Sequence, residues 1–81
     1  MMMNSDIIYD SESLKKDLRL KRIIEYNFSM DVCAKHIGIS KPTLSRIERG
    51  SMPDLLTFFK IVKWLGTDSK NYIKYWFRKR I

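Results

Sequence analysis

The segment DVCAKHIGISKPTLSRIERG, residues 31–50, constrains the fold of this chain more than any other. Two short helical patterns flank Gly38, where a left-handed residue can end a helix without a Cβ penalty. Ser40 is a good N-cap for the second helix, so Pro42 falls in its first turn, where no backbone N–H is needed. The segment therefore predicts two short helices joined by a tight turn.

The two helices of this segment separate apolar from polar positions. Ala34 falls where the first helix must pass close to the second, which requires a small side chain. The inward side is predicted to hold Cys33, Ala34, Ile37, Ile39, Leu44 and Ile47. The outward side of the second helix is predicted to hold Ser40, Lys41, Pro42, Ser45, Arg46 and Arg49. Because all these positions agree, the helix-turn-helix pattern is strong.

The rest of the chain predicts further helices and no strands, so the predicted fold class is all-α. Residues 1–12 are expected to form a flexible acidic arm, and residues 13–81 a single helix-turn-helix domain. Ser11 or Ser13 is expected to cap a first helix that ends near Asn27. The remaining predicted helices are 54–65, which is apolar enough to be largely buried, and a basic aromatic C-terminal helix, 70–80.

Charge indicates the partner. The chain has 81 residues and a net charge of +7. Residues 1–12 carry −3 and residues 13–81 carry +10, with five bases and no acid in residues 70–81. A basic excess of this size in a small domain favours a polyanion, most often nucleic acid. The N-terminus shows no secretory signal and no apolar run could span a bilayer, so we expect a cytoplasmic protein with no membrane partner.

Cys33 and His36 are the only cysteine and the only histidine. They could be half of a metal site, but zinc needs three or four ligands. A Cys–His nucleophile pair is also disfavoured, because Cys33 is predicted to face inward and His36 outward. No phosphate-binding Gly-rich loop or carboxylate pair in a plausible cleft is present. The sequence therefore predicts no metal, no cofactor and no enzyme activity.

At these residues the chain resembles a known family. SMDVCAKHIGISKPTLSRIERG is similar to the helix-turn-helix core of lambda-repressor-like, Cro-type regulators, and PDLLTFFKIVKWLG to the fourth helix of that family. The resemblance covers about residues 14–68. It implies a compact four- to five-helix domain that binds double-stranded DNA, acts as a homodimer on a palindromic operator, and inserts the start of its third helix in the major groove.

The resemblance also implies a role for individual positions. The base-reading residues would be Lys41, Pro42, Ser45 and Arg46. The residues facing phosphates would be Ser29, Met30, Ser40, Arg49, Gly50, Ser51 and Met52. Many members pair a late arginine of the first helix with the residue equivalent to Glu48; here that position is Ile23 or Ile24, so Arg22 or Arg49 is expected to replace it.

The C-terminal segment YIKYWFRKRI has three interpretations. It could pack on the core or across a dimer seam, add phosphate contacts, or lie on an anionic membrane. We favour packing, with Ile73, Trp76 and Phe77 as the dimer interface. The predicted function is a sequence-specific transcriptional repressor from a phage or another mobile element, and the alternative is an antitoxin or interaction module that binds a partner protein.

Overall fold

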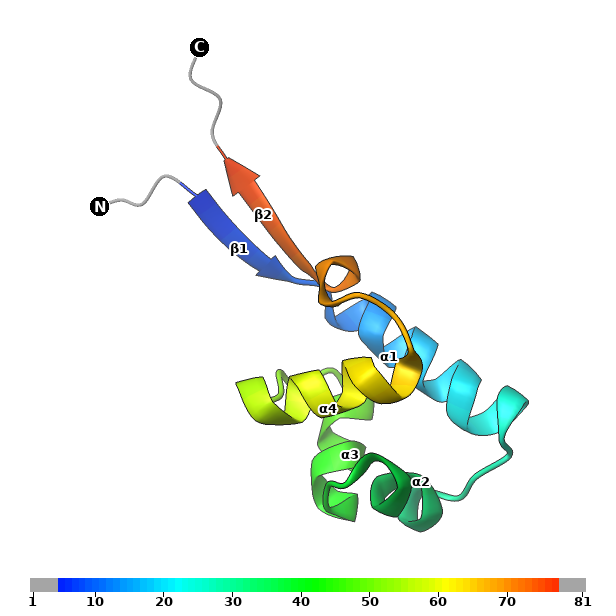
Figure 1. The fold of residues 1–81 in the computed structure, drawn as a ribbon. Coiled ribbons are helices and arrows are strands. Elements are labelled where there is room, and N and C mark those ends of the chain that lie inside the picture. Colours follow the sequence, from blue (N-terminus) through cyan, green and yellow to red (C-terminus); the bar gives the residue numbers. More distant parts are fainter. Residues whose placement is uncertain (1–4, 78–81) are drawn as a thin grey trace.

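In the computed structural model, residues 5–77 are described, with backbone alone for residues 5–8 and 74–77. Helices form a globular body in this part of the chain, and two terminal strands pair as a ribbon that extends from it (Figure 1). The elements are β1 (Ser5–Tyr9), α1 (Ser11–Leu20), the π-helical turn η1 (Lys21–Glu25), α2 (Met30–Ile37), α3 (Lys41–Glu48), α4 (Leu55–Leu65), the 3₁₀ turn η2 (Ser69–Asn71) and β2 (Ile73–Phe77).

The predicted four helices are present, with small changes at the first one. The cap of α1 is Asp10, whose carboxylate accepts the Ser13 N–H at 3.0 Å, and not Ser11 or Ser13. The helix then widens into η1, where the Tyr26 N–H donates to the Lys21 carbonyl at 3.0 Å. Asn27 follows with a φ of 55°, a left-handed conformation that asparagine tolerates better than most residues. The first helix is therefore an α-helix with a π-helical end.

The core lies where the four helices meet. Its buried side chains include all but one of the residues predicted to face inward, and Ile39 packs against them half-buried. The core residues are Leu14 and Leu18 of α1; Cys33, Ala34 and Ile37 of α2; Leu44 and Ile47 of α3; Phe58, Ile61 and Val62 of α4; and Tyr72. The inward face predicted for the helix-turn-helix is confirmed.

The expectation that α4 is largely buried is wrong for its first half. Phe58, Ile61 and Val62 are in the core, but Leu55 and Leu56 are 68% and 67% exposed. Only one side of α4 packs on α1 and α2 within the described chain. The opposite side of its first turns is apolar and open.

The expectations for the chain ends are also corrected. Residues 5–9 form β1 instead of part of a flexible arm, and α1 starts at residue 11. The predicted C-terminal helix is replaced by η2 and β2, and β2 pairs antiparallel with β1, Tyr9 opposite Ile73 and Ser5 opposite Phe77. The segment IKYWF is made mostly of β-branched and aromatic residues, which favour strands once a partner strand is available. Residues 78–80 lie outside the described residues.

Two contacts tie the base of the ribbon to the helices. The Asp10 N–H donates to the Tyr72 carbonyl at 2.7 Å, which continues the strand pairing toward α1. The buried Tyr72 hydroxyl donates to a carboxylate oxygen of Asp17 at 2.6 Å. Burial and this bond to Asp17 raise the pKa of Tyr72 to about 12. The ribbon is thus a continuation of the helical domain.

Candidate nucleic-acid interface

The turn between α2 and α3 fixes the angle of the two helices. Ser29 caps α2 by accepting the Val32 N–H at 3.2 Å, and Ser40 caps α3 by accepting the Thr43 N–H at 3.2 Å. Between them Gly38 has a φ of 94°, and the Ile39 N–H bonds back to the Ala34 carbonyl at 2.9 Å. This hydrogen-bond pattern is a Schellman ending, which stops α2 and directs the chain into α3.

The outer face of α3 presents the predicted reading residues. Lys41, Pro42 and Arg46 are exposed, and Ser45 is half-buried. Thr43, which the sequence analysis did not select, lies among them. Its hydroxyl accepts from the Ser40 hydroxyl at 2.7 Å and from Arg46 Nη2 at 3.4 Å. Thr43 lies three residues after Ser40 and three residues before Arg46. This spacing could have identified Thr43 from the sequence, because residues three apart on a helix are neighbours.

Two further contacts hold cationic side chains on this face. Lys41 Nζ lies 3.7 Å from a carboxylate oxygen of Asp31 on α2. Arg49 Nη1 donates to the Ser45 hydroxyl at 2.8 Å. Both side chains of the Lys41–Asp31 pair are more than half exposed, so the pair contributes little stability. Lys41 can therefore leave Asp31 for another anion at little cost.

The loop after α3 uses part of its backbone internally. The Gly50 N–H donates to the Ile47 carbonyl at 2.9 Å, and the Ser51 N–H to the Arg46 carbonyl at 3.0 Å. These two donors complete the end of α3 and are not free for a phosphate. A phosphate contact by Ser51 would use its exposed hydroxyl. Met52 is 70% exposed.

Beneath the outer face, Arg22 forms a two-bond pair with Glu48. Its Nε donates to Oε2 at 2.7 Å and its Nη2 to Oε1 at 2.8 Å, while Nη1 donates to the Phe28 carbonyl at 3.2 Å. The hydrogen bonds to Glu48 raise the pKa of Arg22. Of the two replacements expected for the missing arginine, Arg22 is the one the structure bears out. The pair links the end of the first helix to the end of α3.

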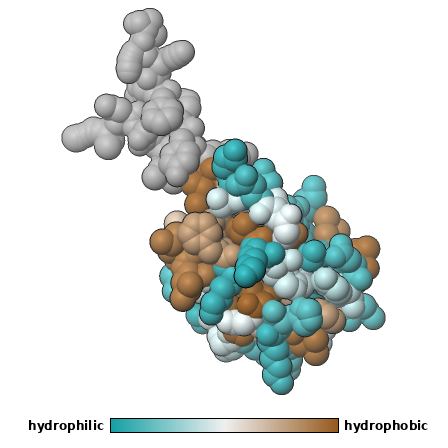
Figure 2. Space-filling view, viewed as in Figure 1, coloured by the Kyte–Doolittle hydropathy of each residue, from teal (hydrophilic) through white to brown (hydrophobic). Residues whose placement is uncertain are grey.

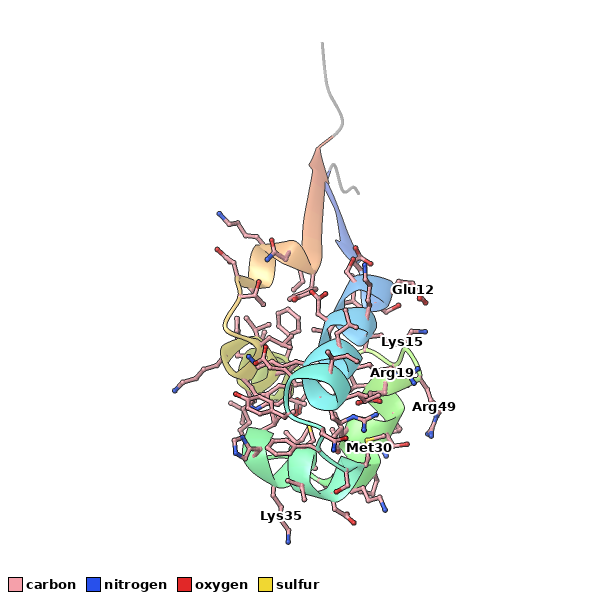
Figure 3. All side chains as sticks on the ribbon, turned by 90° about the vertical axis from the view of Figure 1, so that its right-hand side faces the viewer. Glu12, Lys15, Arg19, Met30, Lys35 and Arg49 are labelled. Carbon is pink, nitrogen blue, oxygen red and sulfur yellow. The ribbon has the colours of Figure 1, made fainter. Side chains whose placement is uncertain are left out.

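Basic side chains of α1 extend the exposed surface beside α3. Arg19 Nε lies 3.9 Å from Glu48 Oε1, which places this residue next to the end of α3. Figure 3 shows Lys15, Arg19 and Arg49 on the same side of the molecule. Arg19 and Lys15 were not among the predicted interface residues, because they precede the helix-turn-helix in the sequence.

Cys33 and His36 do not form a site together. Cys33 is fully buried, and burial raises the pKa of its thiol to about 11, so the thiol is protonated and unreactive at neutral pH. His36 is exposed, and its Nδ1 accepts the Trp64 Nε1–H at 3.2 Å. Within residues described here, no three His, Cys, Asp or Glu side chains gather as metal ligands would.

The residues predicted to form the dimer interface lie in β2. Ile73 is half-buried against the core. Trp76 and Phe77 are strand residues, and their side chains are outside the described part of the structure. Within residues 5–77, no helix is long and apolar enough to cross a bilayer.

Comparison with known proteins agrees with this geometry. A family model described as helix-turn-helix matches residues 18–70. This range includes all of α2, α3 and α4, and it lies between β1 and β2 in the sequence. No curated protein and no solved structure shows significant similarity to the chain.

Proposed function

We propose that this chain, which belongs to the lambda-repressor-like helix-turn-helix family of DNA-binding regulators, is a repressor that binds a palindromic operator as a homodimer. The observation that carries the proposal is the outer face of α3. Exposed Lys41 and Arg46 project there from a helix whose cap and end are both fixed by hydrogen bonds. A rigid helix of this kind can enter the major groove and read base edges.

The side chains of this face suit different parts of the duplex. Arg46 can donate two hydrogen bonds to O6 and N7 of a guanine, the commonest specific contact in the major groove. Its bond to Thr43 orients the guanidinium before DNA arrives. Lys41 and Ser45 add polar contacts, and Pro42 offers an apolar contact to a thymine methyl group. We assign base reading to these four residues, with Thr43 in a supporting position.

Phosphate contacts are assigned around this face. On one side are the N-terminal turn of α2, with Ser29 and the backbone N–H of Met30, and the cap residue Ser40. On the other side are Arg49, the hydroxyl of Ser51, Met52 and, in addition, Arg19. Gly50 shapes the loop rather than donating to DNA. Since residues 13–81 carry +10, release of counterions should supply much of the affinity.

The test is a binding selection from random duplex DNA with the wild type and the Arg46→Ala variant. We expect Arg46→Ala to relax preference at one position in each half-site and to cost about 1–3 kcal/mol on the preferred operator. Lys63→Ala is the matched control. It removes one exposed positive charge from α4, away from the reading face, and should leave the base preference unchanged. An Arg46→Ala protein with the wild-type preference would refute the assignment.

A further inference from the structure

A hollow lies between the last turn of α2 and the C-terminal half of α4. It has a volume of about 510 Å³ and is lined by His36, Ile37, Lys60, Lys63 and Trp64. We call it the α2–α4 hollow. Figure 2 shows hydrophobic side chains over the N-terminal end of α4, below the grey segment, and hydrophilic side chains over the middle of this helix. The volume is within the range of roughly 300–1,000 Å³ that is usual for small-molecule sites.

The polar groups that line the α2–α4 hollow are hydrogen-bond donors. Lys60 and Lys63 carry ammonium groups, which donate and cannot accept. His36 Nδ1 already accepts the Trp64 Nε1–H at 3.2 Å, so the ring proton of His36 lies on Nε2, which is a donor. Among the described residues, no carboxylate lines the hollow. A lining with positive charge and donors, and with no acceptor left, suits an anion.

The two lysines are held in different ways. Lys60 Nζ donates to the Gly38 carbonyl at 3.1 Å, which fixes its ammonium group at the end of α2 and leaves two of its three N–H groups for a ligand. Lys63 is exposed, and the hydrogen bonds and ion pairs formed within residues 5–77 do not involve its side chain. Lys63 can therefore turn toward an anion without breaking a contact of the domain.

The aromatic wall of the α2–α4 hollow is held from outside. Tyr26 and Phe28 stack with 4.8 Å between their ring centroids, and neither of them lines the hollow. The Tyr26 ring lies 5.7 Å from that of Trp64, and the Phe28 ring lies 4.9 Å from that of His36. Lys21 Nζ lies 5.6 Å from the centroid of the Trp64 ring. The rings of Trp64 and His36 are thus positioned in advance, which lowers the entropic cost of binding a ligand.

We infer that the α2–α4 hollow binds a nucleoside phosphate. The phosphate accepts from Lys60, Lys63 and the Nε2–H of His36, and the planar base packs on the indole of Trp64. Charge-assisted hydrogen bonds to a phosphate are the strong ones, and every base has a face that can stack on an aromatic side chain. An acidic peptide would also meet the two lysines, but its carboxylates bring no ring for Trp64. None of the lining residues is assigned to DNA contact, so the inference goes beyond the proposed function.

Other hollows of the described chain fit such a ligand less well. Asp17 and Glu25 line the hollow beside Tyr72, and their carboxylates would repel a phosphate. Lys16 and Arg19 line the hollow at the end of the first helix together with aliphatic side chains, so no ring is available there for a base. The α2–α4 hollow combines positive charge with an aromatic wall.

The experiment follows the indole N–H signal of Trp64 by NMR while the full chain is titrated with adenosine monophosphate. This N–H group is bonded to His36 at the hollow, so a bound ligand should shift its signal. Trp64→Phe identifies the signal, because Trp76 is the other tryptophan. Adenosine and ribose 5-phosphate are matched probes, since each lacks one half of the nucleotide. We expect a dissociation constant below about 1 mM for the nucleotide, and binding at least about tenfold weaker for either half.

Two lysine variants test the assigned charges. Lys63→Met should weaken binding of the nucleotide at least about fivefold, because it removes one charge-assisted hydrogen bond to the phosphate. The fold should be retained, since Lys63 is exposed, and circular dichroism checks this. Lys35→Met is the matched control and should bind like the wild type. Lys35 is exposed on the same turn of α2 as His36, but it does not line the hollow.

A Trp64 signal that does not move with the nucleotide would overturn the inference. Triglutamate that binds as tightly as the nucleotide would also overturn it, and would assign the hollow to an acidic peptide. An equal loss in Lys35→Met would contradict it as well, because net charge alone would then explain the binding. Arg46→Ala should bind the nucleotide like the wild type. A loss in that variant would place the ligand on the outer face of α3 and refute the site, whereas the proposed DNA binding would stand.

Discussion

Replacing Arg22 with methionine should destabilise the domain strongly. The side chains of Arg22 and Glu48 are only 12% and 7% exposed, and they are joined by two short hydrogen bonds. Arg22→Met leaves the Glu48 carboxylate buried without this partner, and it frees the Phe28 carbonyl. Among residues 5–77, the other cation within 4 Å of this carboxylate is Arg19, whose Nε lies 3.9 Å away on a more exposed side chain.

The expected loss follows from the burial of this pair. Removing one partner of a buried ion pair costs about 3–5 kcal/mol of stability. Because both side chains here are slightly exposed, we expect a loss at the lower end of this range, about 3 kcal/mol. A domain of this size has a total stability of about 4–12 kcal/mol at 0.05–0.15 kcal/mol per residue. Since 1 kcal/mol shifts Tm by about 4–8 °C in a small domain, Arg22→Met should lower Tm by about 12–24 °C.

Urea unfolding followed by circular dichroism tests the size of this loss of stability and its cause. The double variant Arg22→Met/Glu48→Leu removes both charges, so it should be more stable than Arg22→Met alone, because no unpaired carboxylate remains. Arg19→Met is the control and should cost under about 1 kcal/mol, since its side chain is 57% exposed. A double variant as unstable as the sum of its single variants would refute the reasoning.

Two further predictions concern pH and the turn. The pKa of Cys33 is raised from 9.0 to about 11, so the folded chain holds the thiol proton more tightly than the unfolded chain does. Its contribution to stability is present below pH 9 and is lost as the pH rises through about 11, by on the order of 3 kcal/mol at most. Cys33→Ala should flatten this part of the stability profile measured by urea titration at each pH, and an unchanged profile would contradict the assignment. Gly38→Ala should lower the free energy of unfolding by about 1–2 kcal/mol. The cost comes from the φ of 94° alone, because the added Cβ meets no atom within 4 Å. Thermal unfolding with no loss of Tm would show that the turn relaxes.

The helix-turn-helix could be predicted because its signals are local. Ser29 and Ser40 as caps, Gly38 at the turn and the inward apolar positions all lie within a few residues of the structure that they specify. The terminal strands could not be found in this way. β1 and β2 pair across more than 60 residues, and the pattern of β2 alone also fits a helix with one apolar side.

The charge distribution gives a physical reason for the pairing of the two ends. The acidic residues 1–12 and the basic residues 70–81 attract each other, and this attraction favours the approach that the backbone bonds between β1 and β2 then fix. The same charges also favour a nucleic-acid partner. Charge asymmetry between the ends of a short chain is therefore also a signal for contact between them.

The error about α4 has a physical reason. Periodicity and composition identify residues that avoid water, but they do not say whether the cover comes from the same chain or from another copy. Phe58 and Ile61 are covered within one chain, whereas Leu55 and Leu56 remain exposed. Leaving such side chains in water has a cost, because burying each of them would gain about 1.5–3 kcal/mol. The prediction of burial therefore fails at Leu55 and Leu56 because the sequence pattern records only that these positions are apolar, and not which surface covers them.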